Sequence, residues 1–178
     1  MVAVIERGAL PTQTEFHEAI ARRADRWYSA CLRITRDREL AEDAVQDALL
    51  SAWRKRHQYQ RDAQLETWIH RIAVNAALQL VRRQRPYVFE TLDTDIADDG
   101  ESPQQDLEDS DLGNALAAAL HHLTDIERVC FVLKHLEQWR LTEIADELGT
   151  NVGGVKQALF RGVKKLRVTM AQLRSKAS

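Results

Sequence analysis

The chain has 178 residues, 44% of them apolar and 6% aromatic, and a formal net charge of −2, which suits one domain or two small ones. Two Cys cannot form a disulfide framework, so we expect a reducing compartment and a cytoplasmic location. No long apolar run is present, and the first ten residues lack an apolar stretch behind a basic one, so neither a membrane span nor a secretory signal is expected.

Helical periodicity dominates the first 85 residues. Thr12 and Glu15 have the spacing of a capping box, and apolar residues follow them at helical intervals. A second helix is expected from Glu39 and, after a polar loop at 57–64, a third over residues 65–83. The side chains expected to point inward from the third helix are Trp68, Ile69, Ile72, Ala76 and Leu80. Because no stretch alternates with period two, a helical bundle without strands is predicted.

Charge divides the chain into three blocks. Residues 1–85 carry a net charge of +4, residues 86–112 carry −10 with no Lys or Arg, and residues 113–178 carry +4. The middle block contains Gly100 and Pro103 and lacks sustained periodicity, so we interpret it as a flexible acidic linker. A solvated surface loop is the alternative interpretation.

The last block is expected to be a second helical domain. Thr124 and Glu127 repeat the capping-box spacing. A short helix over residues 142–148, ended by Gly149, precedes a long helix for which Asn151 is the expected N-cap. Two helices joined by a tight glycine-containing turn are typical of a helix-turn-helix.

The long final helix is basic, because no acidic residue follows Val152. Such a helix can enter a major groove with its first turns while its later cations meet phosphate. A solvated basic helix face is the alternative.

Three motifs carry a family resemblance. Residues 141–167, LTEIADELGTNVGGVKQALFRGVKKLR, resemble the promoter-reading helix-turn-helix of extracytoplasmic-function (ECF) sigma factors, which are small initiation subunits of bacterial RNA polymerase. Residues 41–54, AEDAVQDALLSAWR, look like the polymerase-binding helix of that family, and residues 67–75, TWIHRIAVN, look like its promoter-melting helix. The resemblance implies an all-α fold with two small helical domains, at 11–85 and 113–175, joined by an acidic flexible linker at 86–112.

The resemblance also implies a function. The protein would be an alternative sigma factor, not an enzyme, that binds core RNA polymerase, recognises upstream and downstream promoter elements and melts DNA. The implied partners are the clamp helices of the largest polymerase subunit and the flap, promoter DNA and an anti-sigma factor. No cofactor, metal or membrane insertion is expected.

Site residues follow by matching the motifs. Those expected to bind polymerase are Asp43, Gln46, Asp47, Leu49 and Trp53. Those expected at the downstream element, where a loop can hold an unstacked base, are Tyr59, Gln60, Arg61, Gln64, Arg71, Asn75, Arg82 and Arg83. Those expected at the upstream element are Thr142, Asn151, Val152, Lys156, Gln157, Arg161 and Lys164. Gly154 and Ala158 stand where the family often has Thr and Arg, which suggests altered base readout at the upstream element.

Several alternatives remain open on the sequence. One is a helix-turn-helix regulator with a sensory or partner-binding N-terminal domain, and another is a sigma-factor mimic that sequesters regulators. The acidic linker either mimics nucleic acid inside polymerase or simply stays extended and soluble. A zinc site built from His121, His122, Cys130 and His135 is disfavoured, because Cys130 lies in an apolar stripe and is better explained as a core thiol. A catalytic carboxylate pair at Asp43 and Asp47 lacks any neighbouring partner.

Overall fold

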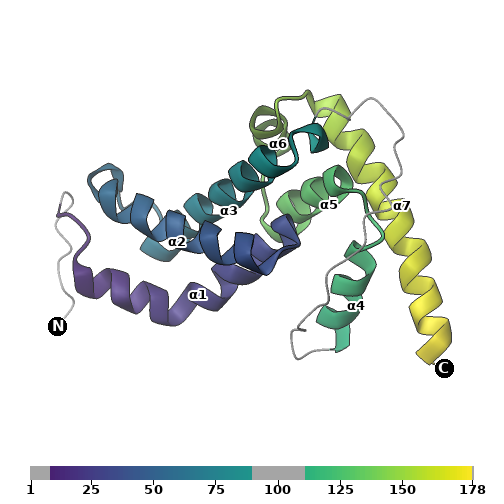
Figure 1. The fold of residues 1–178 in the computed structure, drawn as a ribbon, viewed down its shortest axis with the longest axis horizontal. Helices are drawn as coiled ribbons and strands as arrows, with labels where there is room; N and C mark the ends of the chain where they lie inside the picture. Colours follow the sequence, from purple (N-terminus) through teal and green to yellow (C-terminus); the bar gives the residue numbers. More distant parts are fainter. Residues whose placement is uncertain (1–8, 90–110, 178) are drawn as a thin grey trace. The chain divides into compact units, whose positions relative to one another are not determined.

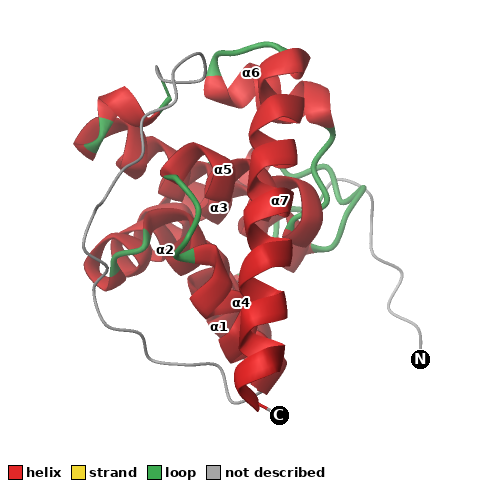
Figure 2. Cartoon of the chain, turned by 90° about the vertical axis from the view of Figure 1, so that its right-hand side faces the viewer, coloured by secondary structure: helices red, strands yellow, loops and turns green. Residues whose placement is uncertain are grey.

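A computed structural model describes residues 9–89 and 111–177, so most of the predicted acidic linker lies outside the described residues. The chain divides into two compact units, Met1–Val81 and Arg82–Ser178. Within the described residues every regular element is a helix, which confirms the all-α prediction (Figures 1 and 2).

The first unit contains α1 (Gln13–Thr35), α2 (Arg38–Arg54), a 3₁₀ turn (Arg56–Gln58) and most of α3 (Leu65–Gln84). The predicted capping box at the start of α1 is confirmed, because the Thr12 hydroxyl accepts from the Glu15 N–H and the Glu15 carboxylate accepts from the Thr12 N–H. Asp37 caps α2 in the same way, by accepting from the Leu40 N–H at 3.0 Å.

Small side chains let α1 and α2 pack closely. Ala41, Ala44, Ala48 and Ala52 of α2 are all buried, and Trp27 of α1 fills the core of this unit. Alanine along one helix face brings the neighbouring backbone near without a large side chain between them. Of the larger apolar side chains of α2, Leu40 is buried with the alanines, whereas Leu50 and Trp53 are exposed.

The inward face predicted for α3 is largely wrong. Ile69 is buried as expected, but Trp68, Ile72, Ala76 and Leu80 are only half-buried. The side chains of α3 that are buried are Leu65, Ile69, Ala73, Val74, Ala77, Leu78 and Val81. Apolar residues occupy much of the circumference of this helix, so their periodicity alone did not fix which side faces the core.

The second unit contains a 3₁₀ turn (Pro86–Val88), α4 (Asp111–Leu120), α5 (Asp125–Phe131), α6 (Leu141–Leu148) and α7 (Val152–Ala177). The second predicted capping box, at the start of α5, is confirmed. A π-helical segment, Val132–Leu136, follows α5 and was not predicted. Such a segment keeps the same apolar residues as an α-helix, so the sequence pattern does not reveal it.

The helix-turn-helix is formed by α6 and α7. Gly149 ends α6 in the left-handed region, at φ 66°, as its predicted C-cap role requires. The Asn151 Oδ1 accepts from the Gly154 N–H at 2.8 Å, so Asn151 caps α7 as predicted. Val155 and Ala158 of α7 pack in the core, as do Ile144 and Ala145 of α6.

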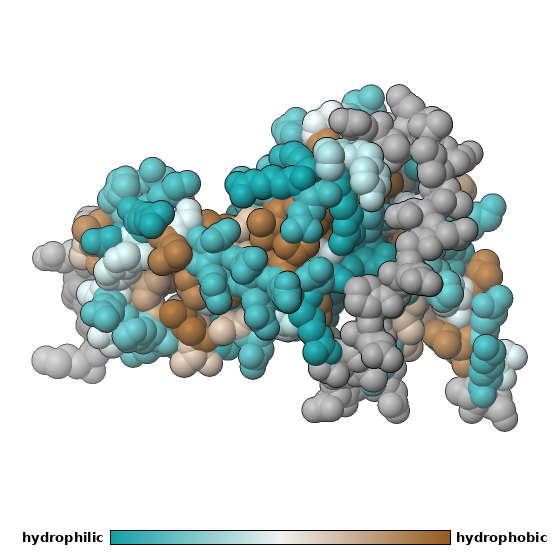
Figure 3. All heavy atoms as spheres, in the orientation of Figure 1, coloured by the Kyte–Doolittle hydropathy of each residue, from teal (hydrophilic) through white to brown (hydrophobic). Residues whose placement is uncertain are grey.

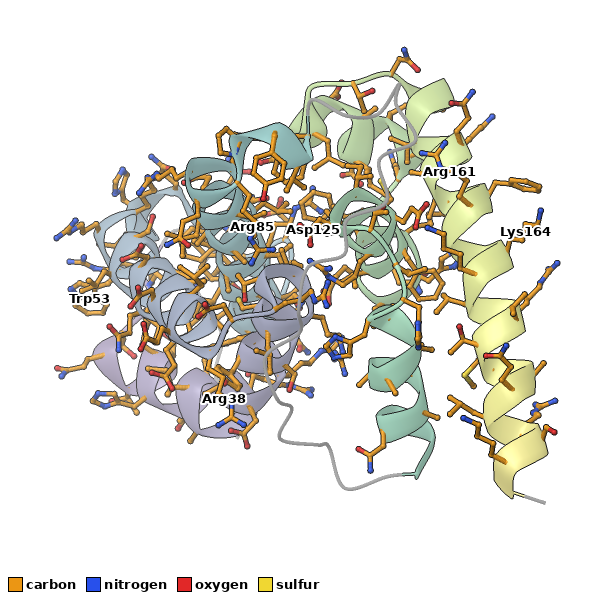
Figure 4. All side chains as sticks on the ribbon, turned by 45° about the vertical axis from the view of Figure 1, so that its right-hand side comes forward. Arg38, Trp53, Arg85, Asp125, Arg161 and Lys164 are labelled. Carbon is orange, nitrogen blue, oxygen red and sulfur yellow. The ribbon has the colours of Figure 1, made fainter. Side chains whose placement is uncertain are left out.

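A buried ionic cluster lies at the start of α5. The Arg128 side chain donates to the Asp125 Oδ1 at 2.7 Å, and Arg85 approaches the Asp125 Oδ2 at 3.2 Å (Figure 4). Arg128 is only 1% exposed. Burial opposes ionisation of Asp125, but the two guanidinium groups outweigh it and hold the pKa of this carboxyl below its usual value.

Candidate polymerase and nucleic-acid interfaces

The outer side of α2 combines carboxylates with apolar groups. Asp43, Gln46 and Asp47 are exposed together, in agreement with their i, i+3, i+4 spacing. Leu49 is half-buried, whereas Leu50, which sequence reasoning missed, is 56% exposed and lies three residues after Asp47. The i, i+3 spacing from Asp47 could have shown that Leu50 shares this face of the helix. We call Asp43, Gln46, Asp47 and Leu50 the acidic face of α2.

Trp53 lies beside the acidic face. It is 38% exposed and points outward from α2 in Figure 4. The Phe16 ring packs edge-on against it, with centroids 5.1 Å apart, and the Arg56 guanidinium lies 4.2 Å from its ring centroid. The ring is therefore fixed in place although much of it faces solvent.

A hollow of about 550 Å³ lies between α1 and the loop that precedes α3. The side chains around it are Glu15, Arg22, Arg23, Tyr59, Arg61, Gln64, Leu65 and Glu66. Three of the residues predicted at the downstream element, Tyr59, Arg61 and Gln64, line this hollow, while Gln60 is exposed nearby in the chain. Cations and an aromatic ring around one hollow suit a nucleobase with its phosphate.

The loop beside the hollow is held rigidly. The Tyr59 hydroxyl donates to the Ala63 carbonyl at 2.6 Å, and its ring packs against Trp68 with centroids 5.3 Å apart. Arg61 has a left-handed backbone, at φ 59°, and pairs with Glu15 at 3.1 Å. Burial raises the pKa of Tyr59, whereas the backbone of Thr12 and then Arg61 lower the pKa of Glu15.

The residues predicted on the melting helix differ in accessibility. Arg71 and Asn75 are half-buried on α3, and the Asn75 Oδ1 is enclosed without a hydrogen-bond partner among the described residues. Arg83 is exposed. Arg82 donates to the Glu147 carbonyl inside the second unit, and its guanidinium lies 5.5 Å from the Phe89 ring centroid. The Arg82 side chain thus already has partners within the protein.

The start of α7 presents most of the residues predicted at the upstream element. Lys156, Gln157 and Lys164 are exposed on one side, together with Phe160, and Lys164 extends outward in Figure 4. We call these four residues the outer face of α7. Asn151 and Thr142 are also exposed, and Val152 is half-exposed. On the side that Figure 3 shows, hydrophilic residues (teal) and apolar groups (brown) of the described residues alternate.

Arg161 and Lys165 have a different role from the outer face. The Glu127 side chain, only 3% exposed, lies 3.4 Å from the Arg161 Nε and 2.8 Å from the Lys165 Nζ. Its Oε2 also accepts from the Thr124 N–H at 3.1 Å. Arg161, predicted to contact DNA, therefore joins α7 to α5, a pairing 34 residues apart in sequence that no local pattern indicates.

The two departures from the family pattern have distinct positions. Ala158 is fully buried, so this position packs in the core rather than on the outer face. Gly154 supplies the N–H that Asn151 caps. A side chain at Gly153 would place its Cβ 3.1 Å from the Asn151 Oδ1, so a glycine there leaves room for the cap.

Both cysteines are buried core thiols. The Cys31 thiol donates to the Ala73 carbonyl at 3.5 Å, and burial raises the pKa of Cys130 to about 12. Within residues 9–89 and 111–177, no group of three His, Cys, Asp or Glu side chains is placed to hold a metal ion. No helix in these ranges is long and apolar enough to cross a bilayer.

We expect neither thiol to react while the protein is folded. A thiolate is the reactive species, and a thiol with a pKa of about 12 is almost entirely protonated at pH 8. Because burial raises the pKa of Cys130 in the folded protein, the free energy of unfolding should decrease as pH rises above the unfolded-state pKa of about 8.5. Timed labelling with iodoacetamide should modify the cysteines only in denaturant, and rapid labelling of the native protein would contradict this.

Two family models and several known proteins match this chain. The Sigma-70 region 2 family model matches residues 19–87, and the Sigma-70, region 4 model matches residues 113–166. The RNA polymerase sigma factor CarQ of Myxococcus xanthus is 31% identical, covering 95% of this chain and 97% of its own. The ECF RNA polymerase sigma factor SigE of Mycolicibacterium smegmatis is 32% identical over 94% of this chain. The chain belongs to the ECF sigma factor family.

This chain spans 65% of the length of SigE. The sigma factor RpoE of Bartonella quintana, solved with the anti-sigma factor NepR, shares the fold, with a TM-score of 0.57 and 21% identity over 89% of this chain and 98% of its own. Sigma factors as a class act in transcription initiation and are not enzymes in the usual sense.

Proposed function

We propose that three surfaces divide the work of this ECF sigma factor. The acidic face of α2, with Trp53, docks on core RNA polymerase. The hollow beside the Tyr59–Gln64 loop captures bases of the downstream element after strand separation. The outer face of α7 reads the upstream element in duplex DNA. The chain supplies binding energy and no bond-making chemistry.

The observation that carries this proposal is the hollow between α1 and the loop. Its lining offers the Tyr59 ring for stacking, the Gln64 amide for base edges and the Arg22, Arg23 and Arg61 guanidinium groups for phosphate. Glu15 and Glu66 offset part of this charge, since they pair with Arg61 and Arg22. Such a lining suits a single-stranded nucleotide better than a continuous duplex.

Docking through α2 fits a partner of basic and partly apolar character. The carboxylates of Asp43 and Asp47 precede Leu50 on the same side of α2, and Trp53 adds aromatic area next to them. Buried aromatic and apolar anchors with charges around them are the usual anatomy of a protein interface. The clamp helices of the largest polymerase subunit are the partner that we assign to this surface.

The remaining partners follow from relatives. Bartonella RpoE is complexed with the anti-sigma factor NepR, and we extend this class of regulatory partner to the present chain. Because polymerase and promoter DNA lie in the bacterial cytoplasm, we place the protein there. Neither a duplex-only regulator nor a sigma mimic needs a hollow suited to an unstacked base, so both alternatives are less well supported.

The experiment that tests the proposal is run-off transcription with core polymerase and the full chain, on a promoter selected from randomised fragments. Tyr59→Ala should reduce transcripts from duplex templates roughly tenfold, because stacking on an aromatic ring contributes about 1–3 kcal/mol per base. A template with the downstream element already unpaired should restore most of the transcript, since the unstacking cost is then absent.

Two variants serve as controls. Tyr59→Phe keeps the ring and loses only the hydrogen bond to Ala63, so it should transcribe nearly as well as the unaltered protein. Gln13→Ala changes an exposed α1 residue without an assigned role. Equal loss on duplex and unpaired templates would contradict base capture by Tyr59. Tight duplex binding without polymerase, and no transcript, would favour the regulator.

A further inference from the structure

Phe160 is the most exposed large apolar side chain of the described residues, at 72%. It lies in the first half of α7, whose core contacts are made by Val155, Ala158 and Leu166 on another side of the helix. Packing within the second unit therefore does not account for a phenylalanine at this position. Sequence reasoning did not single it out.

The neighbours of Phe160 are cationic or amide-bearing. Lys156 and Lys164 lie one turn before and one turn after it, and Gln157 lies three residues before it. All three side chains are exposed, and none of them forms a hydrogen bond or ion pair within the described part of the chain. Arg161, the next residue, turns instead to Glu127. The outer face of α7 thus surrounds one aromatic ring with unneutralised charge.

An occupant of this face must present negative charge on either side of an apolar group. Duplex DNA does so in its major groove, where phosphates border the base edges and thymine alone carries a methyl group among the four bases. Phenylalanine is one of the side chains that contact this methyl. A solitary exposed phenylalanine is unremarkable by itself, but the flanking lysines at one-turn spacing match the phosphates that border such a contact.

We propose that Phe160 is a specificity-determining residue, which reads one thymine of the upstream element through the 5-methyl group. This inference rests on the proposed DNA-reading role of α7. Lys156 and Lys164 hold the backbone on either side, and Gln157 is free to bond a neighbouring base edge. The ring adds selectivity for the methyl without any hydrogen bond.

Deoxyuridine provides the test, because it lacks the methyl group and keeps the pairing edge of thymine. Holoenzyme, made from core polymerase and the full chain, is first given randomised promoters, and each upstream-element thymine of a selected promoter is then replaced by deoxyuridine. We expect one position at which this replacement weakens competitive binding about fourfold, the effect of burying one methyl-sized group. Phe160→Ala should bind thymine and deoxyuridine equally at that position.

Matched variants separate this contact from others. Phe160→Leu should keep part of the discrimination, and Val168→Ala, an exposed apolar residue two turns further along α7, should keep all of it. The proposal is overturned if no thymine shows the effect, if the effect survives in Phe160→Ala, or if that variant binds every sequence equally weakly, as loss of a protein partner or backbone contact would produce. If unaltered holoenzyme selects no promoter, the proposed function fails first and this inference with it.

Discussion

Replacing both Asp43 and Asp47 by Lys is expected to reduce promoter-specific run-off transcription by at least about 100-fold. Both carboxylates are exposed on the acidic face of α2, about two turns and one turn before Leu50. Reversal would place like charges against a basic partner, and such a juxtaposition costs several kcal/mol at an interface. The fold should survive, because neither side chain is buried.

A template with an unpaired downstream element distinguishes this variant from Tyr59→Ala. Because polymerase docking precedes any contact with bases, unpairing should not restore transcription to the α2 variant. Asp25→Lys, which reverses an exposed carboxylate on α1, is the matched control and should retain activity. Normal transcription by Asp43→Lys/Asp47→Lys would show that polymerase binds another surface of the protein. Restored transcription on the unpaired template would show that α2 contributes to DNA melting and not to polymerase docking.

The second large effect concerns stability. Arg128→Met should destabilise the second unit by about 3 kcal/mol, because Asp125 would keep its buried charge after losing its closest partner. Arg85, whose side chain is one-quarter exposed, remains near Asp125 and keeps the loss from being larger. The change in stability of this unit alone is measured by monitoring urea unfolding through hydrogen exchange at the amides of α5 and α7.

The pH dependence gives an independent measure of the same cluster. The pKa of Asp125 is lowered in the folded protein, so its contribution is present above the unfolded-state pKa of about 3.9 and is lost as pH falls through the folded-state value. Arg128→Met should flatten this acid loss. Asp125→Asn/Arg128→Met removes the stranded charge and should be more stable than Arg128→Met alone. A double variant that is less stable would mean that Arg128 acts mainly through packing.

Local signals explain what the sequence predicted well. The capping boxes at Thr12 and Thr124, the helix end at Gly149 and the cap at Asn151 each depend on residues within one turn of one another. These signals place the boundaries of the helix-turn-helix and of α1. Together with the three motifs, they were sufficient to predict two helical units and the family.

Long-range packing explains what was missed. The rotation of α3 depends on which neighbours cover it, and Trp68 and Ile72 proved only half-buried. Leu50 is exposed and Leu49 only half-buried because alanines occupy the inward face of this part of α2. Phe160 and Glu127 became informative only when the structure gave their exposure and partners.

The pairing of Glu127 with α7 changes how this helix should respond to ionic strength. Each contact between a cation and a DNA phosphate releases condensed counterions and adds about 0.9 to the slope of log affinity against log salt concentration. Two of the seven cationic side chains of α7, Arg161 and Lys165, share the single negative charge of Glu127, which neutralises about one of them. Counting the cations of α7 in the sequence therefore overstates the salt sensitivity of promoter binding by roughly one counterion. Selectivity between promoters then rests on base contacts that added salt leaves largely intact.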